Sequence, residues 1–259
     1  MAQTERVNIR DIFEKSLPEP EWLIPDLLVK GSLNMLAGMP GVGKSYFSYY
    51  LSIALASGTP FLGRPTVASP VLYVDEENSP SDLFFYLRWA WEGLGKPSLD
   101  LLEKNLNILH FQLARNPTQW HLALWEQIKE VQPVLTTVDT VTPACQIKDE
   151  NDNGEANTTA QKLRFCQHAS PHSAMLLLKH LREGSKGQVD VRGAKFWKGT
   201  CDSILYHKRH KGHPRKDGLS KTVIEPEKKR AFGLSHSIEI DPERLPSGAI
   251  ILKSNPKPL

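Results

Sequence analysis

The clearest chemical signal in this chain is one eight-residue segment, Gly38-Met39-Pro40-Gly41-Val42-Gly43-Lys44-Ser45. It matches the pattern G-x-x-x-x-G-K-[ST], whose glycines let the backbone fold around an anion and point its N–H groups inward. In such a loop the lysine, here Lys44, reaches the β- and γ-phosphates, and the hydroxyl of Ser45 takes a Mg²⁺ coordination position. We count the next residue, Tyr46, among the nucleotide contacts. The segment predicts that the protein binds a nucleoside triphosphate.

The sequence on each side of the loop supports this interpretation over a glycine-rich turn that binds nothing. Residues 33–37 form an apolar run that predicts a buried strand, and residues 46–56 contain no Pro or Gly and predict a helix. Strand, loop and helix in this order are the context that the motif requires. The helix N-terminus adds a partial positive charge at the loop, which favours a bound phosphate.

Carboxylates follow two further predicted strands. Asp139 comes directly after the apolar run 134–138, where an Asp at a strand tip can hold Mg²⁺ directly or through water. A cap on the following turn is the alternative role for Asp139. Asp75, Glu76 and Glu77 end the second strand, and one of them could polarise an attacking water. Three adjacent acids could instead form a solvated turn.

Apolar runs typical of strands alternate with stretches typical of helices, which predicts an α/β fold with a mostly parallel central sheet flanked by helices. From residue 203 onward, short β-like runs are joined by polar turns, and we expect these runs to be antiparallel strands added at one edge of the sheet. They cover residues 203–207, 221–225, 235–240 and 249–252. We expect residues 1–30 to form an arm or cap and residues 31–259 to form the nucleotide-binding domain.

Composition narrows the class less than the motif does. With 40% hydrophobic and 24% charged residues, the chain has the composition of an ordinary soluble globular protein. Its net charge of +3 neither requires nor excludes a polyanionic partner. The three cysteines lie far apart without a CxxC pair, which argues against disulfides and a zinc site. No long apolar segment or signal core is visible, so we expect a cytoplasmic protein without membrane contact.

Several segments in order resemble the RecA-like ATPases, and most closely the ring-forming replicative helicases that include the plasmid RepA helicases. Besides the phosphate loop, the similar segments are residues 22–31, 54–58, 71–78, 176–182, 190–194 with 201–203, and 228–233. The resemblance implies that Glu77 is the catalytic glutamate and that His180, in a strand ending His-Leu-Arg, senses the γ-phosphate. It also implies that Arg230, with Lys228 beside it, is supplied to the active site of the neighbouring subunit. A planar guanidinium suits the charge that develops on the γ-phosphate.

The resemblance further implies ATP and Mg²⁺ as ligands, a homo-oligomeric ring that we expect to be a hexamer, and single-stranded DNA as a partner. A second hypothesis is an ATP-gated oligomeric scaffold that recruits replication or recombination partners without translocating. A small-molecule kinase is a weaker third hypothesis, because nothing in the sequence resembles a lid or a second substrate pocket. The subtype within the ATPases therefore stays an expectation at this point.

Two basic segments are candidates for contact with nucleic acid. The loop after the predicted strand at 175–178 carries Lys186, and Arg192 follows it. The segment at 208–216 concentrates positive charge and contains Lys208, Arg209 and Lys211. Such clusters bind phosphate backbones with an affinity that falls as salt rises. For the second segment a solvated hairpin tip is an equally good interpretation.

Overall fold

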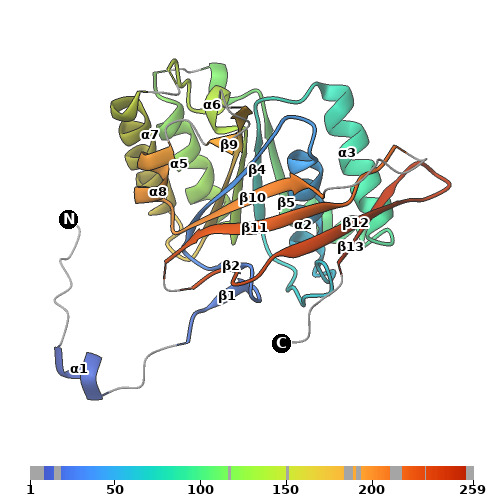
Figure 1. Ribbon diagram of the computed structural model, residues 1–259, viewed down its shortest axis with the longest axis horizontal. Coiled ribbons are helices and arrows are strands. Elements are labelled where there is room, and N and C mark those ends of the chain that lie inside the picture. Colours follow the sequence, from blue (N-terminus) through green and yellow to red (C-terminus); the bar gives the residue numbers. More distant parts are fainter. Residues whose placement is uncertain are drawn as a thin grey trace.

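The structure is a computed structural model, and it describes residues 9–14, 19–115, 118–149, 152–183, 189–190, 194–210, 218–230 and 232–254. One nine-stranded sheet runs through this part of the chain in the order β13-β12-β11-β10-β3-β7-β6-β4-β5 (Figure 1). Its strands are β3 (Leu33–Gly38), β4 (Val71–Asp75), β5 (Leu106–His110), β6 (Leu135–Asp139), β7 (Ala174–His180), β10 (Ser203–Arg209), β11 (Thr222–Lys229), β12 (Ile238–Arg244) and β13 (Ile250–Ser254).

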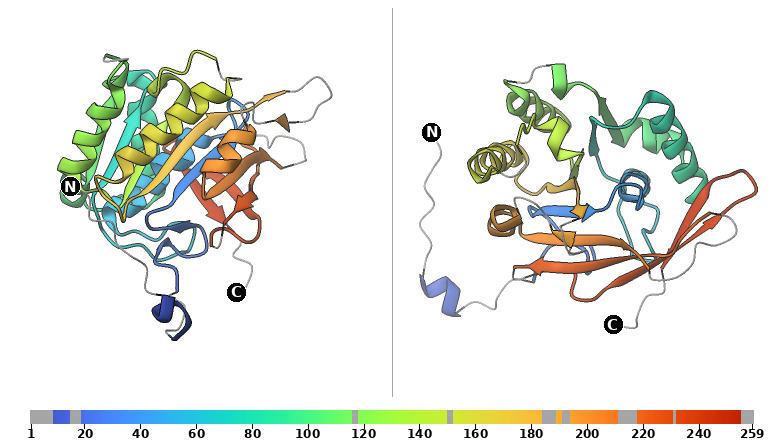
Figure 2. Two further views of the ribbon diagram at one scale, coloured as in Figure 1. Left: turned by 90° about the vertical axis from the view of Figure 1, so that its left-hand side faces the viewer. Right: turned by 45° about the horizontal axis from the view of Figure 1, so that its top comes forward.

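Helices cover both faces of the sheet, as the right-hand view of Figure 2 shows. On one face α2 (Lys44–Ser57) packs against α3 (Pro80–Gly93) and α4 (Leu99–Asn105). On the other face lie α5 (Trp120–Val131), α6 (Val141–Ala144), α7 (Asn153–Gln167) and α8 (Ala194–Thr200). Neighbouring strand residues divide between the two faces, since Leu36 packs with α2 and Met35 packs in the cluster beneath α5 and α7. Burial on both faces explains why the central strands are continuous apolar runs.

The α/β prediction is confirmed, with one correction at the sheet edge. Strands β4, β5, β6, β7 and β3 are parallel, and β11, β12 and β13 are antiparallel additions. The run at 203–207, which we expected to be antiparallel, is β10, and it pairs with β3 in parallel. The chain passes from β7 to β10 through α8 on one face of the sheet. Such a crossover brings the chain back to the starting end of the sheet, so the next strand runs parallel.

Two glycines position the phosphate loop. Gly43 has φ of 101°, a conformation that L side chains rarely adopt, directly before α2 begins at Lys44. Gly38 ends β3, and a Cβ added there would lie 2.5 Å from the backbone oxygen of His207 on β10. The loop therefore lies close against the end of β10. Any side chain at position 38 would force the two apart.

The N-terminal segment contains a helix that stands apart from the rest of the molecule and a hairpin that packs in the core. Helix α1 (Ile9–Glu14) stands off the body of the molecule (Figures 1 and 2). The strands β1 (Trp22–Ile24) and β2 (Leu28–Val29) pair antiparallel, and Ile24 and Leu28 are buried in the core beside α2. The predicted arm thus packs with the core at its C-terminal end, and the domain division at residue 30 stays a prediction.

Short elements complete the described part of the chain. Strand β8 (Arg182–Glu183) pairs antiparallel with β9 (Val189–Asp190), and a 3₁₀ turn, η1, covers Leu113–Arg115. These two were not expected from the sequence, nor were α1, α4, α6 and α8. Among the described residues, the helices are too short or too polar to cross a membrane.

Candidate functional site

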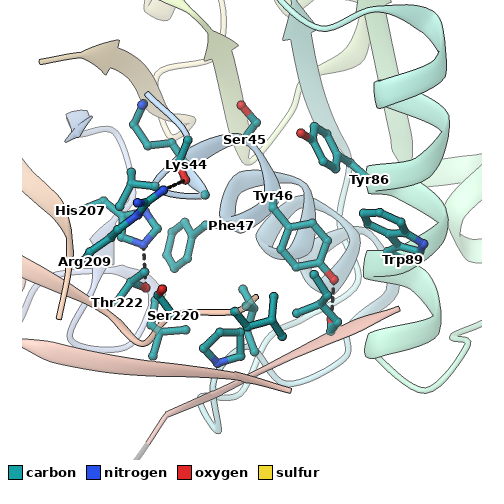
Figure 3. Close-up of a pocket in the computed structure, with 18 of the residues that line it drawn as sticks. Lys44, Ser45, Tyr46, Phe47, Tyr86, Trp89, His207, Arg209, Ser220 and Thr222 are labelled. Atoms are coloured by element: carbon teal, nitrogen blue, oxygen red, sulfur yellow. Dashed lines mark hydrogen bonds between the residues drawn. The ribbon is translucent and has the colours of Figure 1, made fainter. Parts of the chain in front are cut away.

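A cavity of about 360 Å³ opens at the carboxyl end of β3, where the phosphate loop lies (Figure 3). The loop and the first turn of α2 form its floor, α3 forms one wall, and the added strands form the other. The residues that line it include Gly41, Gly43, Lys44, Ser45, Tyr46, Phe47, Glu77, Asn78, Tyr86, Trp89, His180, His207, Arg209, Ser220, Thr222, Ile240, Pro242 and Ile250. The structure thus gathers the predicted loop, Glu77 and His180 around one space.

Lys44, His180 and Glu77 form a connected chain of hydrogen bonds. The Lys44 Nζ donates to the carbonyls of Gly38 at 2.9 Å and Met39 at 3.2 Å, and lies 3.2 Å from His180 Nδ1. An ammonium only donates, so Nδ1 accepts and the ring proton is on Nε2, which lies 2.7 Å from Glu77 Oε1. This hydrogen bond from His180 is the main cause that lowers the pKa of Glu77. Burial lowers the pKa of Lys44 to about 8, and the negative charges of Glu77 and Asp139 oppose this shift.

The three acids after β4 have different surroundings, and these single out Glu77. Asp75 is fully buried and accepts hydrogen bonds from the Tyr49 hydroxyl and, at 3.1 Å, from the backbone N–H of Glu77. Glu76 is 3% exposed and accepts from the backbone N–H of Leu113 at 2.7 Å. The Glu77 side chain is 38% exposed and lines the cavity. Asp75 therefore holds the turn, Glu76 is bonded to η1, and Glu77 is the acid that faces the cavity.

Asp139 has the surroundings of a cation ligand. It is fully buried, and its Oδ2 accepts from the Tyr73 hydroxyl at 2.8 Å and from Asn78 Nδ2 at 3.3 Å. Its Oδ1 is buried with no hydrogen-bond partner within the described part of the chain. Burial raises the pKa of Asp139 to about 6, although the nearby hydroxyls of Tyr73 and Ser45 lower it. An unpaired carboxylate oxygen beside Ser45 fits Mg²⁺, which takes one or two protein oxygens together with nucleotide phosphates and water.

His207 lies beside the start of the phosphate loop, and its buried ring is uncharged. Its side chain is 3% exposed, its Nε2 lies 2.9 Å from the Thr222 hydroxyl, and its ring packs against Phe47 (Figure 3). Burial, with the charge of Lys44 as a smaller cause, lowers the pKa of His207 from its usual 6.5 to about 3. The ring is therefore neutral at physiological pH.

This neutral histidine predicts a loss of stability in mild acid. The unfolded chain binds this proton near pH 6.5 and the folded chain only near pH 3. The contribution of His207 to the free energy of unfolding is therefore fully present above pH 6.5 and decreases as the pH falls towards 3. From pH 7 to pH 5 we expect His207 to contribute a loss of about 2 kcal/mol. Urea unfolding of the wild type and of His207→Gln at both pH values measures this. The variant should lose less stability than the wild type, and an equal loss in both would contradict the assignment.

Lys228 and Arg230 lie at the other end of the added strands. Lys228 Nζ donates to the carbonyl of Cys201 at 2.7 Å, and Arg230 Nη2 donates to the carbonyl of Gly199 at 2.8 Å, where α8 ends. Arg230 Nε is also 3.4 Å from a carboxylate oxygen of Asp202. Neither side chain lines the cavity of its own chain.

The nucleic-acid candidates are only partly described. Lys186, Arg192 and Lys211 lie outside the described residues. Lys208 forms an ion pair with Glu225 at 2.5 Å on the added strands. Arg209 instead lies at the cavity, where its Nη2 donates to the carbonyl of Gly41 at 3.1 Å (Figure 3).

Sequence reasoning missed the walls of the cavity. Tyr86 and Trp89 lie three residues apart on α3, and this spacing in the sequence indicates a shared helix face but not a ligand. His207 and Arg209 reach the cavity only because β10 pairs with β3, and Thr222 only because β11 pairs with β10 in a particular register. A run of short β-like segments carries no signal for that register.

Comparisons with known proteins agree with this geometry. No curated protein matches the chain. A KaiC-like protein from the hyperthermophilic archaeon Pyrococcus horikoshii OT3 superposes with a TM-score of 0.57 at 14% identity, over 90% of this chain and 94% of that chain. At this identity the likeness shows the fold, which is RecA-like. The profile of a family described as an AAA domain matches residues 2–186, more than half of the sequence. The chain therefore belongs to this AAA domain family and carries a RecA-like P-loop ATPase domain.

Proposed function

We propose that this protein is an ATP-hydrolysing motor that assembles as a ring, with a hexamer as the expected form, and acts on single-stranded DNA. The replicative helicases that the sequence resembles are the analogy for this activity. The cavity supports the hydrolytic part of the proposal. Lys44 and the loop N–H groups bind the phosphates, and Glu77 lies where it can orient and deprotonate a water. Ser45 and Asp139 would hold Mg²⁺, which neutralises phosphate charge when bound.

The observation that carries the proposed assembly is the position of Arg230. Thr222, at the start of β11, pairs with Arg209 beside the phosphate loop, and Lys229, at the end, pairs with Ser203. Arg230 follows Lys229, so eight residues of strand, at about 3.3 Å each, separate it by roughly 25 Å from the loop end of the sheet. An arginine so placed cannot reach the nucleotide of its own chain. Its proposed target is therefore a nucleotide bound to a neighbouring copy, and head-to-tail contacts of this kind close into a ring when the rotation between copies allows it.

One observation favours the second hypothesis, an ATP-gated scaffold without translocation. Lys228 and Arg230 already satisfy carbonyls where α8 ends, and Arg230 also pairs with Asp202. Both side chains therefore have a structural use that does not involve a neighbour's nucleotide. In a scaffold, nucleotide binding would control assembly, and hydrolysis would not depend on DNA.

Steady-state ATP hydrolysis, with and without single-stranded DNA and over a range of protein concentrations, separates the two. For a ring motor we expect DNA to stimulate turnover and the turnover per subunit to rise with protein concentration. A turnover per subunit that changes neither with DNA nor with protein concentration would contradict the motor hypothesis and favour the scaffold hypothesis.

A further inference from the structure

Arg209 has a position that its place in the sequence does not indicate. It belongs to the basic segment at 208–216, which suggested contact with nucleic acid. In the sheet, however, His207 on β10 is the register partner of Gly38, the last residue of β3. Arg209 is two residues further on the same face of β10, about 7 Å beyond the end of β3. This places it beside the phosphate loop, which begins where β3 ends.

The side chain of Arg209 makes direct contact with the loop. Its Nη2 donates to the carbonyl of Gly41 at 3.1 Å, and a Cβ added at Gly41 would lie 3.7 Å from the same nitrogen (Figure 3). A guanidinium has five N–H donors in a planar fork. One hydrogen bond to the loop fixes the direction of the fork and leaves donors for phosphate oxygens. Lys208, one residue earlier, points to the opposite face and pairs with Glu225.

The charges around the cavity give Arg209 a clear role. A nucleoside triphosphate brings several negative charges, and among the described residues that line the cavity Lys44 and Arg209 are the only lysine and arginine. His207 is neutral, and burial lowers the pKa of Lys44. Arg209, in contrast, is exposed, and its planar guanidinium can bind phosphate oxygens through two parallel hydrogen bonds.

We propose that Arg209 is a nucleotide-binding residue of its own chain, whose guanidinium binds the polyphosphate of a nucleoside di- or triphosphate beside the phosphate loop. The inference rests on the nucleotide site of the proposed function and not on translocation along DNA. Arg209 links the end of β10 to the bound nucleotide. The chain thus adds a second cation to the site at a position 165 residues after Lys44 in the sequence.

The test is equilibrium binding of ADP and of AMP, with Mg²⁺ and without DNA, to the wild type, Arg209→Ala, Arg209→Lys and Lys221→Ala. Loss of charge-assisted hydrogen bonds should weaken ADP binding to Arg209→Ala about tenfold. The loss should be smaller for AMP, which lacks the β-phosphate, and Arg209→Lys should recover part of the affinity. Lys221 is a matched control, because it carries the same charge directly before β11 and pairs with Asp241 outside the cavity.

The proposal fails if Arg209→Ala binds ADP as tightly as the wild type does. Binding of single-stranded DNA, measured on the same variants together with Lys208→Ala, then identifies the correct alternative. If Arg209→Ala and Lys208→Ala both weaken DNA binding and leave ADP binding unchanged, the segment is a nucleic-acid surface. Since the ADP titrations contain no DNA, they give the same answer whether or not the motor proposal is correct. Melting temperatures near that of the wild type confirm that the variants are folded.

Discussion

Replacing Glu77 with Gln is expected to abolish nucleotide hydrolysis and to leave nucleotide binding nearly unchanged. Glu77 is the one acid of the three after β4 whose side chain faces the cavity, because Asp75 and Glu76 are buried and hydrogen bonded to Tyr49 and Leu113. Glutamine has nearly the same size and can still bond to His180, but it cannot accept a proton from water. Loss of general-base catalysis should lower kcat by about 10²- to 10⁴-fold.

The measurement is single-turnover ATP hydrolysis, paired with titration of ADP to show that the site still binds. Glu92→Gln is a suitable control, since Glu92 pairs with Arg88 on α3 and does not line the cavity. If Glu77→Gln hydrolyses ATP at a rate close to that of the wild type, another group orients the water. The resemblance would then have placed the catalytic glutamate on the wrong residue.

Much of the phosphate-loop side of the cavity could be predicted because its signals are local. The loop is a continuous segment, and its strand and helix lie directly before and after it. Glu77, Asp139 and His180 come from three separate segments, but each ends or follows an apolar run. The carboxyl ends of parallel strands meet at one edge of a sheet, so these residues could be expected near one another. The structure brings Glu77 and His180 into contact with each other and His180 into contact with Lys44.

The opposite wall depends on pairing that the sequence does not encode locally. Short β-like runs after residue 200 predict strands, but hydrophobic pattern alone does not give their direction or partner. The parallel pairing of β10 with β3 is what moves Arg209 from a surface hairpin to the nucleotide cavity. The same pairing buries His207 beneath the loop, and the register of β11 supplies Thr222 as its partner. A shift of one residue would reverse these faces.

Mixing two inactive variants is expected to restore ATP hydrolysis if Arg230 acts on a neighbouring subunit. Lys44→Ala removes the phosphate contact of its own chain, and Arg230→Ala removes the cation supplied to the next. Arg230 follows the end of β11 that is remote from the loop of its own chain. A ring of one variant alone lacks either the lysine or the arginine at every site, so each variant alone should lose most of its activity. In a mixed ring, an intact loop from one subunit meets an intact arginine from the next. With equal amounts and random assembly, about a quarter of the sites should be complete.

The control and the contrary outcomes follow from the contacts of the same strand. Lys229→Ala changes the last residue of β11, which strand alternation places on the face opposite to Lys228, and should keep full activity. Arg230→Ala that hydrolyses ATP normally would show that the side chain only holds the end of α8 through Gly199 and Asp202. Inactivity without recovery on mixing would mean that Arg230 acts through its own chain. Recovery requires two different chains at one site, and a defect in the folding of either variant could not produce it.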